Sequence, residues 1–289
     1  MIINFKEHAE LKEYQQLDEK LIMYNNGAKY GQVVFLAGGA GSGKGFAQQN
    51  FMEVDKFKVF DVDELKKALI KMKDLKMDLR KPQDVFDLHM LVKKGEYKNK
   101  ILSTLFQSLK VSQAGTRGVL PNLMFDITLK EMADINEVLP MLLVLGYKPK
   151  DIHITWVLTN YYVAVQANQE RERVVPDDIL LQTHIGASKT MSKLIQGNIP
   201  AGVDGGVYVI LNTRENTIPW VRKVSDKKTT SVKDKGEKKK LVVKDFTYLT
   251  LRKPGKKFES DSAVKRQVFD WIQDNVPKDA LKQIDIPKQ

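Results

Sequence analysis

The chain has 289 residues, 42% of them hydrophobic and 29% charged, which is typical of a globular protein with a sizeable core rather than a disordered chain. Cysteine is absent, which excludes disulfides, thiolate nucleophiles and cysteine-based zinc sites, and we expect a cytoplasmic protein. No apolar run is long enough to span a membrane, and the first residues lack the pattern of an export signal.

The first part of the chain reads as a βαβ unit preceded by a helix. An amphipathic helix is expected at 5–24, a buried strand at 33–37, a helix at 44–53 and a second strand at 57–61. The segment between the first strand and the following helix is rich in glycine, so the turn at this point is the first candidate for a functional loop.

This turn, in VVFLAGGAGSGKG (33–45), matches the phosphate-binding pattern G-x-x-x-x-G-K-[ST] at Gly38, Gly43 and Lys44. The last position departs from the pattern: Gly45 has no hydroxyl, so Mg²⁺ must be held through water or by carboxylates elsewhere. Adenylate kinases also have glycine there, but they follow it with threonine, whereas Phe46 follows here. The alternative is an ordinary glycine-rich turn with an accidental lysine. The residues expected to bind nucleotide are Gly38, Gly39, Ala40, Gly41, Ser42, Gly43, Lys44 and Gly45.

Strands and helices alternate through the rest of the first two thirds of the chain. Crossover connections of this kind give a mostly parallel sheet, so we predict an α/β fold, a P-loop kinase-like sheet with helices on both faces. Pro176 breaks the helical pattern, and Asp177 can cap the helix that follows. The expected helices are 63–74, 83–94, 98–111, 130–145, 160–173 and 177–196, and the expected strands are 122–126, 152–158 and 207–212.

Acidic residues follow the second and third strands, where a parallel sheet places its functional groups. Asp61 and Asp63 flank one residue, and an extended Asp-x-Asp would place both carboxylates on one side. One can accept a proton, and the other can orient it, cap a helix or hold Mg²⁺. Helix capping alone is the alternative. Asp126, at the end of LMFD, resembles a Walker-B acid, with helix capping again as the alternative.

Further candidates for substrate and phosphoryl contacts lie beyond these acids. Thr128 and Lys130 come shortly after Asp126, and we assign them with Asp61 and Asp126 to substrate binding. Arg171 and Arg173 precede a proline break and can bind transferring phosphoryl oxygens. Their alternative is a solvated charged face, since glutamates alternate with them. Asp61 and Asp126 are the candidate metal ligands, and no histidine has metal-ligand spacing.

The order of these motifs resembles the zeta-toxin-type kinases, P-loop phosphotransferases related to nucleotide and chloramphenicol kinases. The resemblance rests on FLAGGAGSGKG, FDVDELKK, NLMFDITLKEMADI, LGYKPKDIHITWVL and RERVVPDDILLQTH, between about residues 33 and 195. It implies that Lys44 serves the β- and γ-phosphates, that Asp63 is the base on the substrate hydroxyl, and that Arg173 stabilises the phosphoryl group. Arg171 is a second match. The family's Glu-Gly-Thr motif reads Asp126-Ile127-Thr128 here.

The C-terminal part differs from this core in pattern and charge. Between Arg222 and Lys257 there are 14 lysines and arginines against four acids, which accounts for most of the net charge of +11. We predict a basic β-hairpin followed by a helix at 261–275, and divide the chain into a kinase-like core (1–215) and this appendage (216–289). The basic segment can attract nucleic acid or another polyanion, or can be a solvated hairpin tip.

These observations predict an ATP-dependent kinase, with ATP and Mg²⁺ as cofactors, that phosphorylates an alcohol of a UDP-sugar, a nucleotide or a similar acceptor. The family's toxin members act on a UDP-activated amino sugar, while relatives use nucleic-acid ends or small alcohols. One alternative is a polynucleotide 5′-kinase that binds nucleic acid through Arg222–Lys257. The other is a non-catalytic nucleotide-binding scaffold or virion-associated protein. The sequence shows no antitoxin-like segment and indicates no oligomeric state.

Overall fold

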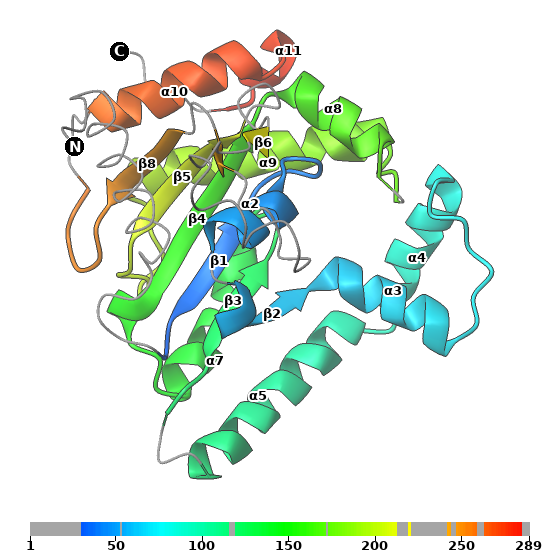
Figure 1. Cartoon of the computed structure of the whole chain (residues 1–289), viewed down its shortest axis with the longest axis vertical. Coiled ribbons are helices and arrows are strands. Elements are labelled where there is room, and N and C mark those ends of the chain that lie inside the picture. The colour runs from blue at the N-terminus through cyan, green and yellow to red at the C-terminus, as the bar shows by residue number, and fades with distance from the viewer. Residues whose placement is uncertain are drawn as a thin grey trace, which may run out of the picture.

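The computed structural model describes residues 30–52, 54–115, 119–171, 173–212, 219–220, 242–243, 247–258 and 263–284. Its centre is a six-stranded sheet with strand order β2-β3-β1-β4-β5-β8 (Figure 1). The six strands are β1 (Val33–Ala37), β2 (Phe57–Asp61), β3 (Asn122–Asp126), β4 (Ile152–Thr159), β5 (Val207–Asn212) and β8 (Thr247–Arg252).

Five of these strands run parallel, and only β8 is antiparallel, along β5. The parallel strands confirm the predicted α/β sheet, since each connection between them carries at least one helix. In the register of β2 and β3, Asp61 lies opposite Asp126. Two acids from separate motifs therefore lie side by side at the carboxyl ends of neighbouring strands.

Helices connect and cover these strands. Figure 1 shows α3, α4 and α5 as an arm beyond β2, at one edge of the sheet. The helices are α2 (Lys44–Phe51), α3 (Val62–Met72), α4 (Pro82–Lys94), α5 (Tyr97–Gly115), α6 (Ala133–Asn136), α7 (Leu139–Val144), α8 (Tyr161–Gln169), α9 (Asp177–Ile195), α10 (Ala263–Asn275) and α11 (Lys278–Leu281).

The two faces of the sheet bury different amounts of apolar surface. Alternate residues of a strand point to opposite faces, and in β1 Phe35 belongs to one hydrophobic cluster while Val34 and Leu36 belong to another. The larger cluster packs the sheet against α5, α7, α9 and α10, and the smaller one packs it against α2. Helices therefore cover both faces, as predicted for a parallel sheet.

The single helix expected at 130–145 is wrong. The chain forms two short helices there, α6 and α7, because Pro140 lies in the first turn of α7 and cannot continue a helix from before it. Leu129, just upstream, has a left-handed φ of 54°. Asp177 also differs from its expected role: α9 begins at Asp177, and Pro176 occupies the capping position.

The C-terminal part contributes to the core sheet. The two short strands β6 (Pro219–Trp220) and β7 (Val242–Val243) pair antiparallel, as a hairpin requires, and the lysine-rich tip between them lies outside the described residues. β8 adds to β5, and Val268 and Ile272 of α10 are completely buried. The division at residue 215 stays a prediction, as does the helix at 5–24, which lies outside the described residues.

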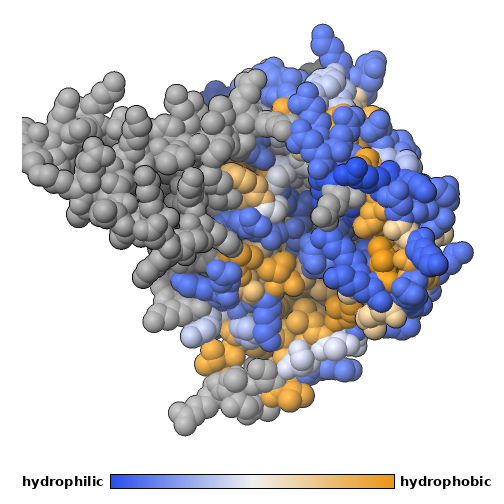
Figure 2. Space-filling view, turned by 45° about the vertical axis from the view of Figure 1, so that its right-hand side comes forward, coloured by the Kyte–Doolittle hydropathy of each residue, from blue (hydrophilic) through white to orange (hydrophobic). Residues whose placement is uncertain are grey.

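The exterior is mixed in character. Figure 2 shows a face on which hydrophobic residues gather below a broad hydrophilic area. Within the part of the chain that the structure describes, no helix has the length and apolarity needed to cross a membrane.

Candidate functional site

The glycine-rich segment forms a tight loop between β1 and α2, which we call the phosphate loop (residues 38–45). Gly43 precedes α2 with a φ of 88°, and a Cβ at this position would collide with the Asn212 side chain. A Cβ on Gly39 would come within 2.5 Å of the His184 ring. Glycine is needed at both positions because neighbouring side chains press against the backbone.

Polar side chains from α9 and β5, one of them buried and two half-buried, hold this loop. The Ala40 backbone amide donates to Thr183 Oγ1 at 3.1 Å, and Nδ2 of the Asn212 side chain donates to the Ser42 carbonyl at 2.8 Å. His184 Nε2 lies 2.7 Å from the Ala40 carbonyl. Burial lowers the pKa of His184 to about 4, so the ring is neutral at pH 7 and its Nε2–H donates to that carbonyl.

Lys44 begins α2 and lies against the loop it follows. Its ammonium donates to the Gly38 carbonyl at 2.9 Å and lies 3.7 Å from Asp126. Asp126 also accepts a hydrogen bond of 2.5 Å from Gln48, one turn further along α2. Burial raises the pKa of Asp126 to about 6, and the charge of Lys44 opposes this rise only in part. The structure thus brings the predicted lysine and the predicted Walker-B acid together.

The loop has the features of a phosphate site. Ser42 Oγ is buried and, among the described residues, has no hydrogen-bond partner. A phosphate oxygen in the loop would satisfy it, and backbone N–H groups at the start of α2 favour an anion. Gly45 has open space where a Cβ would point, so no steric reason excludes a hydroxyl there. The loop and Lys44 therefore fit the phosphates of a nucleotide.

Asp61 and Asp63 differ in position and surroundings. Asp61 is extended, but α3 begins at Val62, so the expected extended Asp-x-Asp is wrong. Asp61 caps α3 by accepting a hydrogen bond of 2.7 Å from the Asp63 amide, and burial raises its pKa. Its cap role is shown. The carboxylates of Asp61 and Asp126 are oxygen ligands of the kind that Mg²⁺ prefers, and their role as metal ligands stays a prediction.

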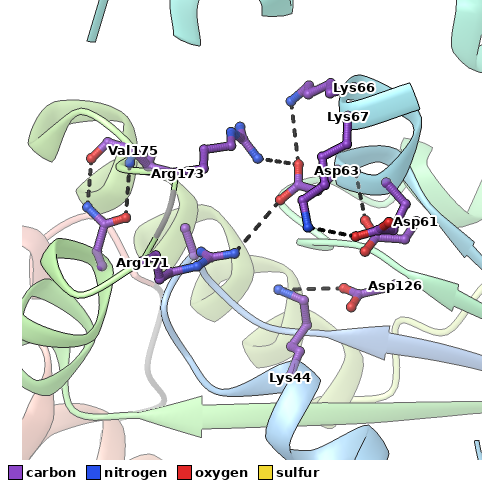
Figure 3. A network of polar contacts seen from close by, with 12 residues as sticks. Lys44, Asp61, Asp63, Lys66, Lys67, Asp126, Arg171, Arg173 and Val175 are labelled. Atoms are coloured by element: carbon purple, nitrogen blue, oxygen red, sulfur yellow. Dashed lines mark hydrogen bonds and ion pairs between the residues drawn. The ribbon is translucent and has the colours of Figure 1, made fainter. Parts of the chain in front are cut away.

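The Asp63 carboxylate lies among three cations, which together with it we call the Asp63 group: Asp63, Lys66, Arg171 and Arg173 (Figure 3). Arg173 forms a close ion pair with it, while Lys66 and Arg171 lie at 3.6 and 4.0 Å. Burial raises the pKa of Asp63, but the charges of Arg173, Lys66 and Arg171 outweigh burial, so the pKa lies below its usual value. Asp63 is therefore ionised at neutral pH.

Both arginines lie in the connection between α8 and α9, which we call the arginine turn. The helix expected to reach residue 173 ends earlier, at Gln169, so Arg171 and Arg173 belong to a turn rather than to a helical face. Figure 3 shows both reaching toward Asp63 from the left, with Lys44 and Asp126 below it. The predicted arginines, base and lysine are thus brought to one place.

Thr128 and Lys130 contact this region mainly through backbone atoms. The Gly38 amide donates to the Thr128 carbonyl at 3.3 Å, and Thr190 Oγ1 donates to the Lys130 carbonyl at 2.9 Å. The Lys130 side chain is exposed and lies against Gly186 of α9. Their expected roles in substrate binding stay predictions.

Two hollows adjoin the site. The first, of about 350 Å³, is next to the phosphate loop and is lined by Gly41, Gly43, Phe46, Thr159, Val163, Ala167, Glu170, Arg171 and Asn212. The second, of about 450 Å³, is on the Asp61 side and is lined by Gln48, Val59, Phe60, Asp61, Glu64, Leu65, Ala68 and Ile101.

The sequence analysis did not identify the residues that support the phosphate loop and Asp126: Gln48, Thr183, His184 and Asn212. They are single polar residues within helices or at strand ends, and each contacts atoms far away in the chain. A polar residue at a position that the helical pattern would bury, such as His184 in α9, was the one available signal. The described residues contain no cluster of three or more acids and histidines that could hold a metal ion.

No family model matches the chain, and no curated protein matches its sequence. Among solved structures, the chain is similar to one from the PezAT chromosomal toxin–antitoxin system of Streptococcus pneumoniae, with 12% identity over 74% of this chain and 80% of that one, and a TM-score of 0.39. It is also similar to a chain of the native AvrRxo1-ORF1:-ORF2 complex, with 11% identity, coverage of 96% and 82%, and a TM-score of 0.41.

A third similar structure is that of AvrRxo1-ORF1:-ORF2 with ATP. It shares 13% identity, over 69% of this chain and 62% of that one, with a TM-score of 0.38. These overall similarities are distant.

Proposed function

We propose that this chain is an ATP-dependent phosphotransferase that acts on an alcohol. The observation that carries the proposal is the Asp63 group, in which an ionised carboxylate and two arginines lie opposite Lys44 and the phosphate loop (Figure 3). Phosphoryl transfer needs cations around the transferring group and a base near the attacking hydroxyl. This site has both kinds of group.

The proposed reaction assigns each residue one task. The alcohol oxygen attacks the γ-phosphorus, the bond from that phosphorus to the bridging oxygen breaks, and ADP leaves. The alcohol proton passes to Asp63, while Lys44 and Arg173 neutralise charge on the phosphoryl oxygens. Bound Mg²⁺ would add countercharge at the β- and γ-phosphates, with Asp61 and Asp126 as its protein ligands.

The ion pair between Asp63 and Arg173 has a consequence for this reaction. While the two are paired, the base is neutralised by the group that should bind the phosphoryl oxygens. A γ-phosphate competes with Asp63 for Arg173, and a carboxylate that loses this partner becomes a stronger base. Binding of ATP would therefore prepare Asp63 to accept a proton.

The hollow beside Asp61 is our candidate for the acceptor subsite. Its walls are largely apolar, and Asp61 and Glu64 are its charged lining residues. Carboxylates repel polyphosphates, so this hollow suits a neutral or amine-bearing alcohol better than a UDP-sugar or a nucleotide. Neutral alcohols, amine-bearing alcohols, UDP-sugars, nucleosides and 5′-hydroxyl oligonucleotides therefore form the acceptor panel for the assay.

The polynucleotide-kinase alternative gains no support from the described residues. The basic tip lies outside them, and Arg252 is buried, with its guanidinium bonded to the carbonyls of Val203 and Gly205 at 3.1 and 2.6 Å. Arg252 therefore holds the fold together and is not free for a phosphate backbone.

The test compares Asp63→Asn with its neighbour Asp61→Asn, using γ-labelled ATP and the acceptor panel. Asp63→Asn should bind ATP at least as tightly, because the amide no longer competes for Arg173, and should lose phosphoryl transfer by roughly 10²- to 10⁴-fold, because an amide cannot accept the proton. Asn is itself a good helix cap, so Asp61→Asn should keep the fold. If transfer is lost in Asp61→Asn and retained in Asp63→Asn, then Asp61, and not Asp63, is the base. Absence of transfer by the wild type to every acceptor would favour the non-catalytic scaffold.

A further inference from the structure

One buried amide closes the arginine turn. Asn168, in the last turn of α8, is completely buried. Its Nδ2 donates to the Val175 carbonyl at 2.7 Å, and its Oδ1 accepts from the Val175 amide at 3.0 Å. Val175 is itself buried. A single side chain thus satisfies both backbone groups of a residue on the far side of the turn.

Arg171 and Arg173 lie between Asn168 and Val175, in the segment that these two hydrogen bonds close. A further hydrogen bond fixes the same side of the turn, since the Val174 amide donates to the Leu79 carbonyl at 3.0 Å. Leu79 lies between α3 and α4, and α3 carries Asp63. The backbone that carries both arginines is therefore tied to α8 by a side chain and to the helical arm by a main-chain bond.

The choice of asparagine fits this task. Asn is a poor residue for a helix interior, and a buried amide costs free energy unless its donor and acceptor are both used. Here both are used, on one residue. Aspartate would keep the acceptor and lose the donor, and alanine would leave the N–H and the C=O of Val175 buried without this partner.

We infer that Asn168 is a positioning residue for phosphoryl transfer, which acts by holding Arg173 and Arg171 toward Asp63. The inference rests on the proposed function for its kinetic consequence. Its structural consequence, a turn held by one amide, is independent of any activity, so the two can be tested separately.

The variants are Asn168→Ala and, in case this one does not fold, Asn168→Asp. The matched control is Asn122→Ala. Asn122 is also a buried asparagine whose Oδ1 accepts a backbone amide, from Gln32 at 3.0 Å, but it lies at the start of β3, away from the arginine turn. Its removal should cost stability without moving the arginines.

The first readout is trypsin cleavage after Arg171 and Arg173 in the folded protein, followed by mass spectrometry. We expect the Asn168 variants to be cut there at least five-fold faster than the wild type, and Asn122→Ala to be cut there at the wild-type rate. Unchanged cleavage in a folded Asn168 variant, or equal acceleration in Asn122→Ala, would overturn the inference. This readout needs no turnover, so it stands even if the proposed function fails.

The second readout is a double-mutant cycle on turnover. Asn168→Ala should lower kcat about ten-fold with little change in KM for ATP, and should have no further effect on kcat when Arg171 and Arg173 are both alanine. A ten-fold loss that persists in that background would show that Asn168 acts by another route. An active wild type with unchanged kcat in Asn168→Ala would overturn the inference while leaving the phosphotransferase proposal intact.

Discussion

Apart from Lys44, the phosphate loop is held by uncharged hydrogen bonds from the buried His184 and the half-buried Thr183 and Asn212, whereas the Asp63 group is held by ion pairs to a partly exposed carboxylate. His184 is 6% exposed, while the Asp63 side chain is 37% exposed. Neutral hydrogen bonds fix a geometry and are insensitive to salt, whereas ion pairs to a carboxylate that water reaches are partly screened and exchange partners more readily. The loop is thus built as a rigid receptor, and the Asp63 group as a set of charges that ATP can redistribute.

The largest effect should come from a change in the phosphate loop. Lys44→Ala should reduce phosphoryl transfer by roughly 10³-fold or more, because its ammonium neutralises phosphate charge, while the fold stays intact. Labelled-ATP assays and thermal unfolding check this, with Lys98→Ala as the control, a partly exposed lysine of α5 that pairs with Glu137 and lines neither hollow. Wild-type turnover in Lys44→Ala would refute the assignment of the loop.

The next effect tests the rigidity of the loop. His184→Ala removes a buried ring and leaves the Ala40 carbonyl without that donor, so we expect a loss of about 2–4 kcal/mol in unfolding free energy together with weaker ATP binding. His153→Ala is the matched control, because that ring is also buried and hydrogen-bonded, to Gln32 and the Gly206 amide, but lies at the start of β4, away from the phosphate loop. If ATP binding weakens equally in both variants, His184 does not support the loop.

A smaller effect should appear as a pH dependence at Asp126. A carboxyl whose pKa is raised to about 6 in the fold favours folding while protonated, and it loses this contribution as the pH rises through 6. In the absence of nucleotide and metal, this residue should cost about 1–2 kcal/mol of stability between pH 5 and pH 8. Denaturant titrations should show that Asp126→Asn removes this dependence and that Asp87→Asn, exposed on α4, does not. An unchanged pH slope in Asp126→Asn would contradict the expectation.

The smallest effect concerns position 45, where Gly45 replaces the Ser or Thr hydroxyl of the phosphate-binding pattern. A side chain at Gly45 meets open space, so Gly45→Ser should fold, with a stability change within about 1 kcal/mol. If Asp126 and Asp61 hold Mg²⁺ beside the loop, the added hydroxyl should strengthen Mn²⁺ or Mg²⁺ binding to the ATP complex a few-fold, measured by titration calorimetry. Gly39→Ser is the contrast, because it would strike the His184 ring. Unchanged metal affinity would place the metal elsewhere.

The sequence predicted the parts of the site that repeat a local pattern. The phosphate loop, the acids at the ends of β2 and β3 and the two arginines could be found because spacing and strand ends indicate them, and the parallel sheet follows from alternating strands and helices. The supporting residues could not be found in this way. Asn212, His184 and Asn168 bond to backbone atoms at positions that only the folded chain brings near, and β8 joins β5 through a pairing that no local signal specifies.

The attachment of β8 and α10 to the sheet has a consequence for the order in which the molecule is made. Leu249, Leu251, Val268 and Ile272 complete the larger hydrophobic cluster, and Asn275 of α10 accepts a hydrogen bond of 2.7 Å from Asn160, the cap of the helix that carries Asn168. Residues 33–212 leave the ribosome before these groups do. The nascent chain can therefore carry every proposed kinase motif and still lack part of the core beneath them, so full activity should follow, and not precede, synthesis of α10.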